Sequence, residues 1–163
     1  MGLLIAKTDF IDTYALAASI SDSIDAYIDE YEEKYLRELL GASLFTLFKA
    51  DVTNSVPVTT KYLTIFNEIN SDEDGFLLHS DGMKKMLLGF VWFEYVVGTQ
   101  ITHTNTGVVS DVNEISVNAD NSLTYRQYNR AVDTYRAIQY YITKNNATYA
   151  EFAGVNKRFA SSL

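Results

Sequence analysis

The stretch MKKMLLGFVWFEYVVGTQI, residues 83–101, is the most apolar and aromatic part of this 163-residue chain. As an α-helix it would be about 30 Å long, which is the width of a small domain. A membrane span needs about 20 predominantly apolar residues, whereas the apolar run here is shorter and contains Glu94. The sequence therefore predicts a buried central helix against which other helices pack, and no membrane segment.

Length and composition indicate one domain. A chain of 163 residues with 47% hydrophobic content can close one substantial core and is too short to be expected to form two. We therefore expect a single helical domain over residues 1–163. Within it we expect an N-terminal arm at 1–20, an extended loop at 103–121 and a C-terminal tail at 154–163.

Charge and cysteine content exclude several classes of protein. The chain has 21 acidic and 13 basic residues and a net charge of -8, whereas proteins that grip nucleic acid through phosphates need a basic surface. The sequence contains no cysteine, so it has no disulfide framework, thiolate metal site or thiol nucleophile.

Apolar residues recur at three- and four-residue steps in other stretches, which is typical of amphipathic helices. Gly41 is a natural helix stop, and the acidic face that carries Asp29, Glu32 and Glu33 is expected to be solvated. The fold class predicted is all-α, a bundle of about four main helices with a long extended or hairpin loop between the last two. The helices are expected at residues 23–40, 59–70, 82–102 and 122–145.

Two connections between these helices differ in character. Residues 70–81 place acidic side chains and Gly75 at positions of a calcium-binding loop, but Asn70 and Asp81 stand where Asp and Glu are required. A helix end followed by a new N-cap at Ser80 or Asp81 is therefore favoured, and no metal site is predicted.

The second connection, residues 103–121, is polar and longer than a structural link needs. Val108 and Val109 precede a turn signal at residues 110–113, and Ile115 and Val117 then alternate with polar residues, which favours a small hairpin or extended loop. Such a loop is functional or simply a flexible surface segment, and both interpretations stay open.

The sequence contains few residues and no motifs that are typical of catalytic sites. The chain has two histidines, His79 and His103, and no phosphate-binding glycine loop or hydrolase or metalloprotease motif. Glu94 could be a carboxyl with a raised pKa, an ion-pair partner or a solvated residue. We predict no enzyme activity, no catalytic residue, no cofactor and no metal.

The order of several motifs nevertheless resembles a known class. An apolar start is followed by YIDEYEEKYLRELLG, the pair Leu44 and Phe45, the helix GFVWFEYV, the segment TNTGVV and a last helix with YNRAV. This order is similar to the head-to-tail connector (neck or adaptor) proteins of tailed bacteriophages, in particular those of phages and prophages of Bacteroides-type bacteria. The resemblance covers Leu3 to about Ile142.

The resemblance implies a structural virion protein that assembles into a homo-oligomeric ring, a dodecamer, in the neck between head and tail. Its partners would be further copies, the portal protein and tail or other neck proteins, with DNA passing through without specific binding. Assembly would occur in the host cytoplasm. The assembly contacts implied are Leu3, Leu4, Ile5, Phe10, Thr106, Gly107, Val108, Val109, Ile115 and Val117.

A different class satisfies the composition equally well. A monomeric helical adaptor or regulator could recognise one protein partner through a surface rich in tyrosine, of which the chain has 12. The apolar N-terminal arm likewise has two interpretations, because it either docks on its own core or reaches a neighbouring subunit.

Overall fold

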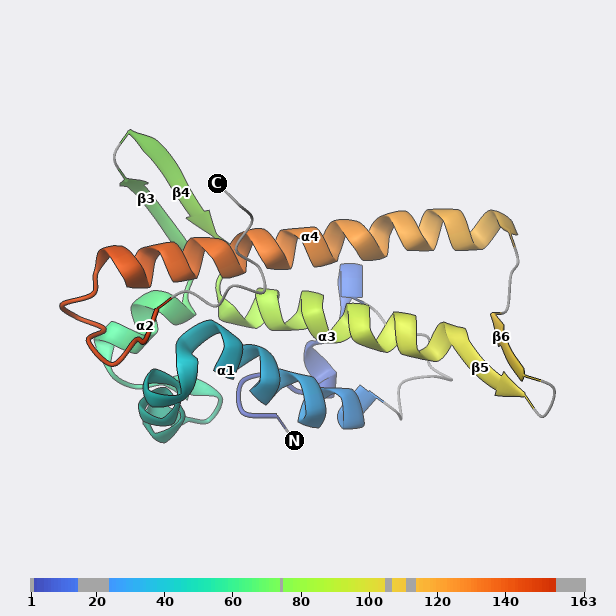
Figure 1. Cartoon of the computed structure of the whole chain (residues 1–163), viewed down its shortest axis with the longest axis horizontal. Helices are drawn as coiled ribbons and strands as arrows, with labels where there is room; N and C mark the ends of the chain where they lie inside the picture. The colour runs from blue at the N-terminus through green and yellow to red at the C-terminus, as the bar shows by residue number, and fades with distance from the viewer. Residues whose placement is uncertain (1, 15–23, 74, 105–106, 111–113, 155–163) are drawn as a thin grey trace.

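The computed structural model describes residues 2–14, 24–73, 75–104, 107–110 and 114–154. Its long helices lie roughly side by side, with α3 between α1 and α4 in the view of Figure 1. The helices are α1 (Ile24–Asp51), α2 (Thr60–Phe66), α3 (Met83–Gln100) and α4 (Glu114–Lys144). Two single 3-10 turns, η1 (Lys7–Asp9) and η2 (Asp12–Tyr14), form the N-terminal arm.

Three two-stranded antiparallel ribbons accompany the helices in the described residues. They are β1 (Val52–Thr53) with β2 (Val56–Pro57), β3 (Ile69–Glu73) with β4 (Phe76–Ser80), and β5 (Ile101–Thr104) with β6 (Gly107–Ser110). The all-α prediction is therefore wrong. Because the described residues form six strands as well as the helices, the fold is mixed α/β.

The β3–β4 ribbon occupies the region for which a helix end and an N-cap were predicted. The helix expected at 59–70 ends at Phe66, and the next strand begins at Ile69. Gly75 adopts φ 85°, a conformation that glycine reaches without steric cost and that a tight turn requires. In β4, Leu78 and Ser80 are buried while Leu77 and His79 are exposed, which is the alternation of a strand covered on one face.

The β5–β6 ribbon is a hairpin in the region predicted at 103–121 as a small hairpin or extended loop, but it lies at the start of that region and pairs other residues than predicted. Its strands are Ile101–Thr104 and Gly107–Ser110, and the helix α4 already begins at Glu114. Ile115 and Val117 therefore belong to a helix, contrary to the prediction that they form a second strand. Two apolar residues at alternate positions are too few to separate a strand from the first turn of a helix.

Helix α1 continues beyond its predicted end but changes direction there. Gly41 has φ 71° and ψ 164°, which are non-helical, so the helix is kinked at the position predicted as a stop. The residues after the kink turn Leu44, Phe45 and Phe48 into the core, where each has at most 1% exposure.

Helix α3 is the centre of the core, as the sequence predicted. Phe90 is fully buried and stacks on Tyr35 of α1, with ring centroids 4.2 Å apart. It also meets Tyr128 and Tyr135 of α4 edge-on, at 5.6 and 6.2 Å. One aromatic side chain of α3 thus connects α1 to α4. Glu94, on the same helix, accepts a hydrogen bond from the Tyr35 hydroxyl at 2.6 Å.

The backbones of α3 and α4 approach closely at Gly89. A Cβ atom added there would lie 2.8 Å from the Ala131 Cβ and 3.0 Å from the Gln127 carbonyl oxygen. Only glycine fits this contact without displacement, so Gly89 sets how closely the two helices pack.

We expect Gly89→Ala to destabilise the fold. Alanine is favoured over glycine in a helix by about 1 kcal/mol, but overpacking at this contact should exceed that gain and leave a net loss of about 1–2 kcal/mol. Urea denaturation measures the change. In a double-mutant cycle with Ala131→Gly, which removes the nearest clashing atom, a favourable coupling of at least about 0.5 kcal/mol is expected. Strict additivity would contradict the close approach.

Candidate functional site

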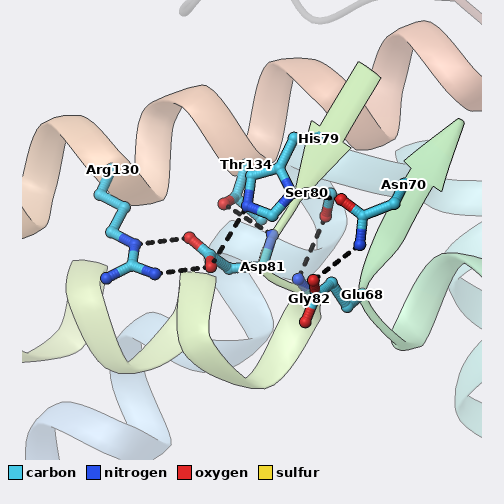
Figure 2. Close-up of polar contacts among 8 residues, drawn as sticks. All are labelled: Glu68, Asn70, His79, Ser80, Asp81, Gly82, Arg130 and Thr134. Carbon is cyan, nitrogen blue, oxygen red and sulfur yellow. Dashed lines mark hydrogen bonds and ion pairs between the residues drawn. The ribbon is translucent and has the colours of Figure 1, made fainter. Parts of the chain in front are cut away.

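A polar cluster lies at the base of the β3–β4 ribbon, where β4 leads into α3 and α4 passes alongside (Figure 2). We call it the hairpin-base cluster. Its residues come from the segment before β3, from β3, from β4, from the corner between β4 and α3, and from α4. Its members are Glu68, Asn70, His79, Ser80, Asp81, Gly82, Arg130 and Thr134.

The strongest contact in the cluster is the ion pair between Asp81 and Arg130. Arg130 donates from Nε to Asp81 Oδ2 at 2.6 Å and from Nη2 to Oδ1 at 2.7 Å, a bidentate geometry. The Asp81 side chain is only 8% exposed, and the Arg130 hydrogen bonds hold the pKa of its carboxyl below the ordinary value. The Asp81 backbone N–H also donates to Thr134 Oγ1 at 3.3 Å, a second link to α4.

His79 extends the cluster across the ribbon. Its Nδ1 lies 2.7 Å from Asn70 Oδ1 on the paired strand, and its Nε2 lies 3.6 Å from Asp81 Oδ1. Asn70 in turn donates from Nδ2 to Glu68 Oε1 at 2.7 Å. The two strands are thereby connected by side chains to the residue that binds α4.

The corner between β4 and α3 depends on Gly82. It has φ 88°, and its N–H donates to Ser80 Oγ at 3.1 Å. A Cβ atom there would lie 2.9 Å from the Phe66 carbonyl oxygen at the end of α2. The close packing of this corner and the Asp81–Arg130 pair together fix the direction in which the ribbon leaves the helical body.

The side chains of this cluster hold one another, and with them the β3–β4 ribbon, in a fixed position. Its contacts join carboxylate, amide, imidazole and guanidinium groups to one another, and within the described ranges no three His, Asp or Glu side chains gather as metal ligands. The arrangement orients a projecting ribbon.

A second site lies where the N-terminal arm crosses α1. Glu32 is 3% exposed and accepts three consecutive backbone N–H groups, from Leu3 at 2.5 Å, Leu4 at 2.6 Å and Ile5 at 2.9 Å. Burial raises the pKa of the Glu32 carboxyl, and the three N–H donors oppose that rise. We call this the Glu32 clasp. The prediction that Glu32 belongs to a solvated face is wrong, because the arm covers it.

The predicted assembly residues are not brought together into one surface. Leu4, Ile5 and Phe10 are buried in the subunit's own core, and Leu3 packs partly against it. Gly107, Val108 and Val109 lie in β6, which follows the end of α3 far from the β3–β4 ribbon (Figure 1), and Thr106 lies outside the described residues. Of the two interpretations of the arm, this structure shows the arm docked on its own core.

Sequence reasoning missed the residues that organise both sites. Asp81 was considered as the last position of a calcium-binding loop and as an N-cap, whereas its partner Arg130 lies 49 residues further along the chain. Glu32 lies 27 to 29 residues from the N–H groups that it binds. A buried carboxylate held by distant backbone donors leaves no local pattern in the sequence.

Comparison with known protein families identifies the family of this chain. A model of a family of unknown function (DUF6712) matches residues 36–161, and the chain belongs to this family. Neither the curated proteins nor the solved structures contain a match. Among the described helices, none combines the length and apolarity needed to cross a membrane.

Removal of the clasp carboxylate should be costly. Glu32→Ala leaves three backbone N–H groups without their acceptor, and we expect a loss of about 2–4 kcal/mol in the free energy of unfolding. Thermal and urea denaturation measure it. The matched control is Glu33→Ala on the same helix, which loses only exposed ion pairs with Arg37 and Lys49 and should leave the midpoint nearly unchanged. Equal effects of the two substitutions would contradict the clasp.

The Asp81–Arg130 pair predicts a pH dependence. Because the folded-state pKa of Asp81 is lowered from 3.8, its contribution to stability is complete above about pH 5 and is lost as the pH falls below 3.8. Arg130→Gln should cost about 1 kcal/mol at pH 7, since solvent screens this half-exposed arginine, and progressively less as the pH falls below 3.8. Arg136→Gln on the same helix is the control, because its Asp133 partner is 4.0 Å away and exposed. A wild-type-minus-mutant difference that does not change with pH would contradict the assignment.

Proposed function

We propose that this chain is a structural subunit of the head-to-tail connector of a tailed bacteriophage, forming a ring between portal and tail through which DNA passes. The observation that carries the proposal is the β5–β6 ribbon, which leads on from the end of α3 at one end of the helical body (Figure 1). A ribbon in this position supports contact between subunits. The segment TNTGVV, part of the resemblance to connector proteins, overlaps this ribbon.

The second ribbon supports the same proposal. The β3–β4 ribbon exposes Leu77, 73% accessible, and Phe76, 47% accessible, while the hairpin-base cluster fixes its direction. An apolar tip on a rigidly oriented ribbon is suited to insertion between neighbouring proteins, since exposed apolar groups at defined positions mark interaction sites.

Charge supports a passive conduit. A channel lined with many arginine or lysine side chains would bind DNA phosphates and retard its passage. The net charge of -8 disfavours binding of DNA phosphates and is compatible with the passage of DNA. Under this proposal the assembled protein lies in the neck of the virion after assembly in the host cytoplasm, and the chain has no catalytic role and no cofactor.

The other candidate is a monomeric adaptor that uses the exposed Phe76 and Leu77 to bind one protein partner. Both candidates predict binding through the β3–β4 tip, but they differ in stoichiometry. A connector forms a closed ring with many copies, whereas an adaptor binds one to one.

Co-expression with the portal protein encoded by the same phage or prophage tests the proposal. We expect the wild-type chain to co-purify with the portal as a ring of fixed copy number, a dodecamer, as measured by native mass spectrometry. Replacing residues 103–108 by a two-residue Asn-Gly turn should leave the thermal midpoint nearly unchanged, because the ribbon lies at the end of α3, but should abolish ring formation.

Val58→Ala, at a residue that is 66% exposed and lies outside all three ribbons, serves as a matched surface control for folding, since truncation of an exposed side chain should cost less than about 0.5 kcal/mol. A one-to-one complex of fixed mass would favour the adaptor. A chain that never associates with the portal, or a ribbon-shortened variant that still forms rings, would overturn the proposal or its assignment to β5–β6 respectively.

A further inference from the structure

The N-terminal arm, residues 2–14, is held by the rest of the chain as a bound peptide would be. Much of its hydrogen bonding is internal, including Asp9 N–H to the Ala6 carbonyl at 2.9 Å, Ala6 N–H to Asp9 Oδ2 at 2.9 Å and Tyr14 N–H to the Ile11 carbonyl at 3.0 Å. Such an arm carries its own local structure to whichever surface receives it.

The first anchor of the arm is the Glu32 clasp on α1. All three donors to the carboxylate are main-chain N–H groups, so Glu32 holds the arm through its backbone. The apolar side chains of Leu4 and Ile5, with exposures of 0% and 1%, are buried beside it. This combination of backbone capture and two buried side chains is typical of a peptide-binding site.

The second anchor of the arm is on α3. Lys84 Nζ lies 3.2 Å from Asp9 Oδ1, and the Tyr14 ring meets Trp92 edge-on with centroids 6.1 Å apart. The receiving surface thus consists of two helices that the core already fixes relative to each other. A cleft of about 350 Å³ beside the clasp, lined in part by Gly2, Leu3 and Lys49, gives solvent access to the start of the arm.

We propose that this arm exchanges between copies, so that the Glu32 clasp and the α3 anchor of one subunit receive residues 2–14 of the next. The inference rests on the proposed function, because that function supplies the neighbouring copies. An identical arm makes identical contacts from a second chain, so exchange loses no interaction and is governed by the effective concentration of the neighbour. Exchange from each subunit to the next is head-to-tail, the arrangement that closes into a ring.

Chain length permits this arrangement. Nine residues, 15–23, separate the arm from α1 in the sequence. A chain of this length spans at most about 30 Å, which is comparable to the width of a small domain. A neighbouring clasp within that distance is therefore accessible to the arm.

Cross-linking in a chain without native cysteine tests the exchange. A donor variant, Asp9→Cys, and an acceptor variant, Lys84→Cys, are mixed with a short bismaleimide linker, which replaces the contact between the two side chains. We expect a covalent heterodimer in the mixture. The control mixture of Glu33→Cys and Arg37→Cys, which are neighbours on α1 of the same chain, should give only background product.

Substitution of Glu32 distinguishes the chain that receives the arm from the chain that donates it. Glu32→Gln in the acceptor chain removes the charged acceptor of three N–H groups and should lower the heterodimer yield at least about tenfold. The same substitution in the donor chain should not lower the yield, because it weakens only the donor's hold on its own arm. A merely structural role for Glu32 would lower the yield equally in both chains.

Exchange is overturned if the heterodimer stays at the control level at concentrations where the wild-type chain forms rings, or if its yield is independent of Glu32 in the acceptor. Rings that co-purify with the portal but carry only intrachain cross-links would support the connector proposal and contradict the exchange. Heterodimers that form without any association with the portal would support the exchange and contradict the connector proposal. A chain that remains monomeric and gives no heterodimer removes both.

Discussion

The close approach of α3 and α4 at Gly89 is the constraint on which the rest of the structure depends. The contact to Ala131 and the Gln127 carbonyl brings α4 against α3 and sets the position of every later side chain on α4. Arg130 and Thr134 then reach Asp81 at the base of the β3–β4 ribbon. At the next residue, the Tyr135 hydroxyl donates to the Glu38 carbonyl of α1 at 2.8 Å, and one turn further on Gln139 Nε2 donates to the Tyr135 oxygen at 3.0 Å. The same packing that fills the core thus orients the polar contacts at its edge.

Features that depend on local sequence were predicted correctly. The central helix was recognised from its apolar run and α1 from the spacing of its apolar residues. Gly41 was predicted as a helix stop from the conformational freedom of glycine, and it interrupts α1 without ending it. Each of these signals lies within a few residues of the structure that it predicts. The helices also appear in the predicted order, although α1 and α4 are longer than expected and α2 is shorter.

Features that depend on distant contacts were not predicted. The β3–β4 ribbon has a short apolar run, FLLHS, whose inward face is covered by α4, with Phe76 against Tyr140 at 5.4 Å. Without knowledge of α4, the acidic residues of β3 resembled a loop. Glu32 resembled a solvated carboxylate because the backbone groups that bury it come from the arm. Both errors have one physical origin, which is that burial by a distant segment reverses the expectation from local polarity.

The described structure combines a helical body, ribbons at its two ends and an N-terminal arm, residues 2–14, that has its own local hydrogen bonds. In the proposed assembly, the helices packed on α3 would supply rigidity, and the ribbons and the arm would supply the contacts to neighbouring proteins. This division of roles suits a protein that connects other proteins, as proposed above. The proposed role in the phage neck uses all three features, because a ring needs a stiff subunit, contacts to neighbouring proteins and a link from each subunit to the next.

Quantitative mass spectrometry of purified particles of the encoding phage tests the connector proposal most directly. The proposal predicts that peptides of this chain are present in intact virions at a fixed ratio to the portal protein, and that they remain with the portal when heads and tails are separated gently. Absence of the chain from purified particles, while it is abundant in the infected cell, would contradict the account.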